Sequence, residues 1–68
     1  MNWHITSRAS ETSDCGCYEI KHSRDPHRGD FYNAWHVPTG KHVDADRQRE
    51  VVRKSCERHA AKQLDLVP

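Results

Sequence analysis

The fold of this 68-residue chain is decided by residues 44–64, DADRQREVVRKSCERHAAKQL. Apolar side chains recur there every fourth residue, at Val52, Cys56, Ala60 and Leu64. Ala45, Val51 and His59 lie close beside this row. This spacing places one narrow apolar stripe on an α-helix of about four to five turns. Asp44 or Asp46 can cap the first turn, because a carboxylate oxygen accepts the free amide protons there.

Before residue 44 the apolar residues follow a period of two, which is typical of half-buried strands. Strands are predicted at residues 3–7, 17–21 and 31–37, with a short edge strand at residues 41–43. Residues 8–14 and 23–30 are expected to be polar loops, and residues 38–40 a turn. We therefore expect one α+β domain over residues 1–68, in which an antiparallel three- to four-stranded β-meander packs against one C-terminal α-helix.

The core must be small, because only 34% of the residues are hydrophobic. Its bulk is expected from a few large side chains: Trp3, Ile5, Tyr18, Ile20, Phe31, Tyr32, Trp35, Val37, Val43, Val51 and Val52. Trp35 is expected to anchor this core from the middle of its strand, with Phe31 and Val37 on the same face.

Composition also narrows the classes of partner. Eleven Lys and Arg against ten Asp and Glu give a formal charge of +1, which is no electrostatic reason to expect nucleic acid or an anionic membrane. The sequence has neither a run of about 18 apolar residues nor a secretory signal pattern. Three cysteines, an odd number, favour free thiols in a reducing compartment, and we expect a cytoplasmic protein.

One metal site is an alternative to consider. Cys15, Cys17, Cys56 and His59 make a Cys3His set, which zinc binds tetrahedrally. The spacing speaks against it, because a C-x-C in a strand separates the two thiols by about 7 Å. Burial of Cys56 on the helix stripe is the favoured interpretation, since free cysteine is among the most buried residue types. No cofactor is expected outside this zinc alternative.

No catalytic residue is predicted. A cysteine hydrolase needs a thiolate, a base within hydrogen-bond reach and an oxyanion hole. The sequence has cysteine and histidine but no strand-turn-helix nucleophile site, and a chain this short has no room for a deep cleft. We therefore expect a protein that is not an enzyme.

Three short patterns carry a resemblance to a known group. Tyr18-x-Ile20, Tyr32-x-Ala34-Trp35 and Cys56-x-x-His59-Ala60 together span most of the chain. This arrangement resembles short phage and prophage accessory proteins, many of which have a β-meander and a C-terminal helix. Because that group includes inhibitors of host defence such as anti-CRISPR proteins, the resemblance implies a protein inhibitor.

The leading expectation is a small non-catalytic protein-binding module. Arginine is the charged residue most enriched at binding hot spots, and four arginines are candidates for contact: Arg24 and Arg28 in the loop at residues 23–30, and Arg49 and Arg53 on the helix. Charge reversal at these positions is expected to weaken binding and leave the fold intact. The alternative is a small zinc-stabilised or nucleic-acid-binding module, since the basic helix face can follow phosphates.

Overall fold

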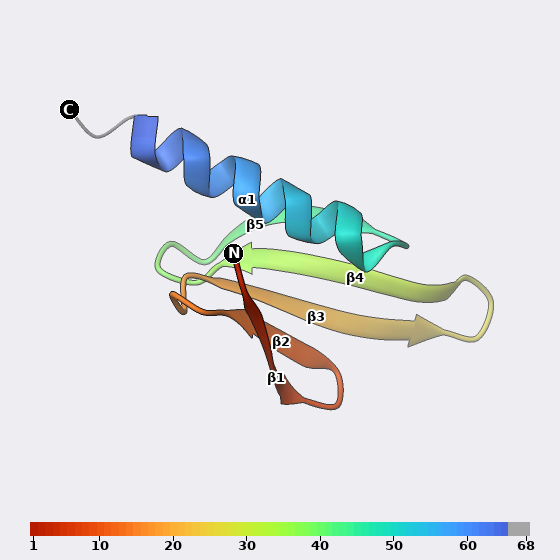
Figure 1. The fold of residues 1–68 in the computed structure, drawn as a ribbon. Helices are drawn as coiled ribbons and strands as arrows, with labels where there is room; N and C mark the ends of the chain where they lie inside the picture. The colour runs from red at the N-terminus through yellow and green to blue at the C-terminus, as the bar shows by residue number, and fades with distance from the viewer. Residues whose placement is uncertain (66–68) are drawn as a thin grey trace.

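The computed structural model describes residues 1–65 and the side chains of residues 1–62. Five strands precede one helix: β1 (Trp3–Ser7), β2 (Ser10–Ser13), β3 (Tyr18–Asp25), β4 (Gly29–His36), β5 (Lys41–Asp46) and α1 (Arg49–Asp65). The strands form one sheet in the order β1-β2-β3-β4-β5, and all neighbours are antiparallel. The expected α+β meander with one C-terminal helix is confirmed (Figure 1).

The sheet has more strands than expected, because β2 forms inside the segment predicted to be a loop. Its sequence, Ser-Glu-Thr-Ser, carries no apolar signal. Two of its side chains are nevertheless buried, since Glu11 is 5% and Ser13 is 3% exposed. Ser13 Oγ accepts a hydrogen bond from the backbone N–H of Tyr18 at 3.1 Å, and Glu11 is bound by arginine. Polar partners rather than apolar burial hold this strand in the sheet.

The β3–β4 hairpin is longer than the sequence indicates. β3 runs to Asp25 and β4 begins at Gly29, so most of the predicted loop at residues 23–30 is strand. Asp25 Oδ1 accepts the backbone N–H groups of His27 at 2.7 Å and Arg28 at 3.2 Å, which closes a tight turn. Gly29 has φ +82°, a conformation that side chains disfavour, and ends this turn. The hairpin projects past the start of α1, which makes the molecule elongated, 46 × 20 × 19 Å (Figure 1).

The helix begins later than residue 44, because residues 44–46 still belong to β5. Asp46 Oδ1 accepts the backbone N–H of Gln48 at 2.9 Å and so serves the helix start. Asp44 instead accepts a hydrogen bond from the hydroxyl of Ser55 in α1, which ties the helix to the strand before it. The side chain of Leu64, the last residue predicted in the apolar stripe, lies outside the described side chains.

The core lies between α1 and the facing side of β3 and β4. Its fully buried members are Tyr18, Ile20, Ala34, Val52 and Cys56. Val52 and Cys56, both 0% exposed, confirm the predicted helix stripe. Small residues on the helix and at Ala34 allow the two layers to lie close together.

Trp35 is not the core anchor that the sequence predicts. Tyr32, Ala34 and His36 point toward the helix, whereas Trp35 lies on the opposite face of the sheet with Phe31. There Trp35 is half-buried beside His42, with ring centroids 5.5 Å apart, and Lys21 Nζ lies 5.8 Å from its ring. The prediction that Val37 lies in the core is also wrong, because Val37 is 49% exposed.

The helix covers only part of the sheet. α1 packs on β3, β4 and β5, whereas the β1–β2 hairpin extends beyond it (Figure 1). Ile5 of β1 is consequently 81% exposed. Within the described residues no helix is long and apolar enough to cross a membrane.

Candidate binding site between the helix and the first hairpin

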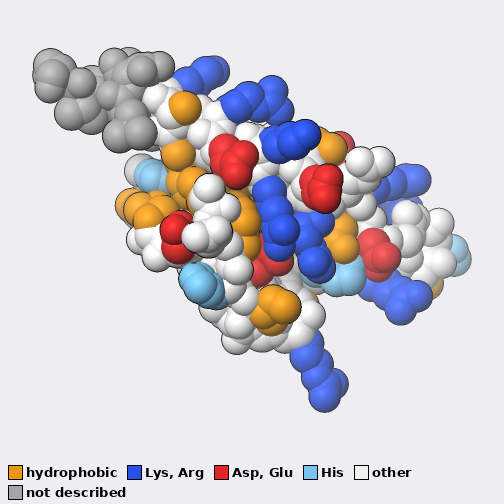
Figure 2. Space-filling view, in the orientation of Figure 1, with side chains coloured by type: hydrophobic (Ala, Val, Ile, Leu, Met, Phe, Trp, Pro, Cys, Tyr) orange, Lys and Arg blue, Asp and Glu red, His pale blue; other side chains and the backbone are white. Residues whose placement is uncertain are grey.

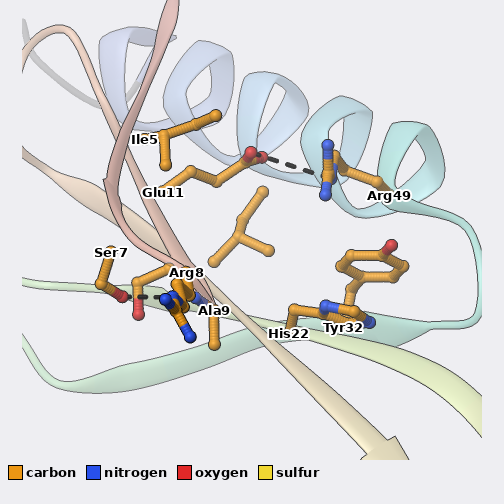
Figure 3. A pocket seen from close by; sticks show the side chains of 10 residues that line it. Ile5, Ser7, Arg8, Ala9, Glu11, His22, Tyr32 and Arg49 are labelled. Carbon is orange, nitrogen blue, oxygen red and sulfur yellow. Dashed lines mark hydrogen bonds and ion pairs between the residues drawn. The ribbon is translucent and has the colours of Figure 1, made fainter.

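A small pocket of about 50 Å³ lies where the helix leaves the helix-side face of the sheet uncovered. It is bounded by residues of β1–β4, of the β1–β2 turn and by the first residue of α1: Ile5, Ser7, Arg8, Ala9, Ser10, Glu11, Ile20, His22, Tyr32 and Arg49. Figure 3 shows Glu11 and Arg49 facing each other across it, with Tyr32 and His22 side by side at its floor.

Strand register brings these side chains to one face. Ile5 pairs with Glu11, and Glu11 pairs with Ile20, so all three point to the helix side. Two residues further along β3, His22 pairs with Tyr32 of β4 and points the same way. The period of two in each strand therefore builds the pocket from residues that are distant in sequence.

Glu11 is the buried charge of the site. Its side chain is 7% exposed and receives two hydrogen bonds from Arg53, from Nε at 2.9 Å and from Nη2 at 3.0 Å. Arg49 Nε lies 3.7 Å from the same carboxylate. The hydrogen bonds to Glu11 raise the pKa of Arg53 above its ordinary value. A buried carboxylate is tolerable only with such partners, so this pair also fastens β2 to α1.

Arg49 is held between two neighbours and yet open to solvent. Its guanidinium carbon lies 5.2 Å from the ring centroid of Tyr32. Tyr32 in turn stacks on His22, with ring centroids 4.7 Å apart and planes at 12°. His22 Nε2 is 3.0 Å from Oδ1 of Asp30. With 45% of the Arg49 side chain exposed, the guanidinium offers free donors at the mouth of the pocket.

The four predicted arginines divide into two pairs. Arg49 and Arg53 meet at Glu11, whereas Arg24 and Arg28 lie with Phe31 around an open groove at the tip of the β3–β4 hairpin. Arg24 is 85% exposed and reaches Asp30 only at 3.9 Å. The contacts of Arg53 change what we expect of its charge reversal: it would set two carboxylates together and should disturb the fold as well as any binding.

The basic helix face is less basic than the sequence suggests. Arg49 and Arg53 turn toward Glu11, and acidic side chains lie beside the other helix cations, as Figure 2 shows over α1. Glu57 lies 3.7 Å from the N-terminal amine of Met1. Among the described side chains, the basic face is therefore reduced to a row of Lys54, Arg58 and Lys62, spaced four residues apart, with Glu57 beside it.

The Cys3His set does not assemble. Cys15 is exposed in the β2–β3 connection, Cys56 is buried on the sheet-facing side of α1, and His59 Nδ1 is 2.7 Å from the hydroxyl of Tyr18. Burial raises the pKa of the Cys56 thiol to about 11, which keeps it protonated. Among the side chains described, no three of the His, Cys, Asp and Glu type are placed to hold a metal ion. This corrects the zinc alternative and agrees with Cys56 as a core residue.

Sequence reasoning identified two of the site residues and missed the others. Arg49 and Arg53 were candidates, but Glu11 lies in a segment without apolar signal, and Tyr32 and His22 read as strand residues like their neighbours. The available signal was Glu11 itself, the only acidic residue between Met1 and Asp14. No protein-family model, curated protein or solved structure matches this chain.

Proposed function

We propose that this protein is a small non-catalytic protein-binding module that holds an acidic side chain of its partner against Arg49. The exposed, pre-positioned guanidinium of Arg49 carries the proposal. Tyr32 on one side and Glu11 on the other restrict this side chain, so less conformational freedom is lost when a ligand binds.

The size of the pocket favours a side chain over a metabolite. Pockets for small molecules usually enclose about 300–1,000 Å³, whereas this one encloses about 50 Å³. That volume is suited to a carboxylate or a few water molecules. A partner would therefore insert one side chain here and make the rest of its contacts on the surface around the pocket.

Charge favours an acidic side chain. Arg8 and Arg49 line the pocket together with a single carboxylate, Glu11, whose oxygens already accept hydrogen bonds from Arg53. An arriving carboxylate would meet donors of Arg49 that Glu11 leaves free. Ile5, 81% exposed at the rim, supplies apolar surface beside this polar contact.

The identity of the partner follows only from the resemblance to phage accessory proteins. We include in the proposal that the partner is a host defence complex, which makes the protein an inhibitor. Subunits of such complexes are the first proteins to test for binding, once peptide selection has located the binding site.

Selection of displayed peptides on the immobilised protein tests the proposed site. We expect enrichment of peptides with Asp or Glu next to aliphatic residues. Arg49→Gln should weaken their affinity at least about tenfold, which corresponds to 1.4 kcal/mol. Arg47→Gln is the matched control, because Arg47 is exposed and does not line the pocket.

Thermal melting of both variants checks that the fold is kept. Equal affinity of Arg49→Gln and the parent, or selection of peptides without acidic residues, would contradict the proposal. Binding of an oligonucleotide with a steep salt dependence would favour the nucleic-acid alternative instead.

A further inference from the structure

Two cysteines occupy one short connection that the proposed binding function does not use. Cys15 and Cys17 flank Gly16 between β2 and β3. Cys15 is exposed and Cys17 is half-buried, and neither forms a disulfide. Both cysteines lie outside the strands, so the spacing of about 7 Å for alternate residues of a strand does not apply to this pair.

The turn folds the Cys17 thiol back against the backbone of Cys15. Gly16 has φ +75°, which glycine adopts without strain, and its N–H donates to the carbonyl oxygen of Ser13 at 2.9 Å. Cys17 Sγ donates to the carbonyl oxygen of Cys15 at 3.8 Å.

The surroundings of the two thiols differ. Cys15 Sγ lies 3.3 Å from the hydroxyl oxygen of Ser13. Hydrogen bonds from the Ser13 hydroxyl and from the backbone N–H of Cys17 lower the pKa of Cys15, whereas the neighbouring Cys15 raises the pKa of Cys17. Since the thiolate is the nucleophile in disulfide exchange, Cys15 is the attacking residue of the pair and Cys17 the resolving residue.

Cys56 provides an internal reference. It is 0% exposed on the sheet-facing side of α1, and its thiol stays protonated near neutral pH. The same chain therefore holds an accessible pair of thiols in the turn and one inert thiol in the core. A reaction at Cys15 and Cys17 but not at Cys56 would be due to the turn and not to cysteine in general.

We propose that the Cys15-Gly16-Cys17 turn is a thiol–disulfide exchange site that takes small disulfides of the glutathione class as oxidant. The Cys15 thiolate attacks one sulfur of the small disulfide and forms a mixed disulfide, which releases the first small thiolate. Cys17 then attacks Sγ of Cys15 and releases the second. The two protein thiols are oxidised, one small disulfide is reduced to two thiols, and the two protons from Cys15 and Cys17 end on those thiols.

The experiment uses the full chain and oxidised glutathione, followed by an acid quench, unfolding in denaturant, alkylation of the remaining thiols and measurement of the intact mass. The parent is expected to lose two hydrogen atoms and to keep one alkylatable thiol, at Cys56. Cys17→Ser should stop at the mixed disulfide and gain the mass of one glutathione on Cys15. Cys15→Ser should react at least about tenfold more slowly than Cys17→Ser, and Cys56→Ser should close the disulfide as the parent does.

Three results would overturn the proposal. They are a parent that keeps three alkylatable thiols, a disulfide that links two chains in place of one, and a Cys15→Ser variant that reacts as fast as Cys17→Ser. Circular dichroism of each variant confirms that the fold is present when the rates are compared.

Discussion

The phenolic oxygen of Tyr18 lies 2.7 Å from Nδ1 of His59 and so connects the first residue of β3 with the C-terminal half of α1. The two rings meet edge to face, with centroids 5.6 Å apart and planes at 82°. Burial raises the pKa of Tyr18, which keeps its hydroxyl protonated. A neutral His59 can accept this proton at Nδ1, whereas an imidazolium cannot.

The stability of the fold is expected to fall in mildly acidic solution through His59. Burial lowers the pKa of His59, and His36 of β4, Lys41 of β5 and Lys62 of α1 lower it further. The unfolded chain therefore takes up a proton near pH 6.5 while the folded chain resists it, so stability is lost as the pH falls below about 6.5.

Chemical denaturation between pH 7.5 and 5 measures this loss. His59→Gln, whose amide can still accept the Tyr18 hydroxyl proton, should show a flatter dependence of the unfolding free energy on pH. An identical slope in parent and variant would assign the acid sensitivity to other groups.

Truncation of a core side chain, Ile20, should destabilise the fold more than truncation of Trp35 on the opposite face of the sheet. Ile20 is 1% exposed, and Ile20→Ala should lower the free energy of unfolding by about 2–5 kcal/mol. Trp35→Ala should cost less, because Trp35 lies half-buried on the face of the sheet without a helix. Urea denaturation of both variants checks the order, and a larger loss for Trp35→Ala would contradict the assignment of the faces.

The two arginines at Glu11 should differ in their effect on stability. Arg53→Ala removes both hydrogen bonds to a carboxylate that is 7% exposed and should cost about 1–3 kcal/mol. Arg49→Ala removes a longer, more exposed contact of 3.7 Å and should cost at most about 1 kcal/mol. Lysine cannot form the two parallel hydrogen bonds of a guanidinium, so the unfolding free energy of Arg53→Lys should lie between those of the parent and Arg53→Ala. Equal melting temperatures for the two alanine variants would refute this ranking.

The Ser55–Asp44 contact should be measurable by its pH dependence. The Ser55 hydroxyl lowers the pKa of Asp44, and the backbone N–H of Ala45 adds to this effect. Stability from this carboxylate is present above about pH 3.9 and is lost as the pH falls through its lower folded pKa. Ser55→Ala should therefore cost about 1 kcal/mol at neutral pH, and the difference from the parent should shrink in acid. A constant difference from pH 7 to 2 would exclude the carboxylate as its source.

The fold was predictable because the apolar period changes once along the chain. Helix and meander follow from that change, and Val52 and Cys56 occupy the predicted stripe. Hydrophobicity alone could not predict which face of β4 packs on the helix. Phe31 and Trp35 are more hydrophobic than the residues around Ala34 that do face the helix. Close approach of the helix decides the face, since it requires a small residue such as Ala34, which is 0% exposed.

The site was predictable only in part, for a different reason. Arg53 and Glu11 are 42 residues apart, and a pairing of this kind depends on strand register and helix placement. Composition made the arginines candidates for contact, but it carried no information about which of them would instead pair with a buried carboxylate of the same chain. β2, whose burial rests on such pairings, was missed for the same reason.

Because α1 covers only part of the sheet, we expect parts of the molecule to open separately. β1 and β2 are tied to the helix by side chains, through the Glu11–Arg53 pair and through Trp3, whose ring lies 5.8 Å from the Arg53 guanidinium, while the rest of the hairpin extends past the helix. Segments with little apolar contact open with a smaller free energy than the rest of a domain, so backbone amides of β1 and β2 should exchange hydrogen for deuterium before those of β3 and β4. Each such opening would expose the unpaired edge of β3, a template on which a strand of another chain can add.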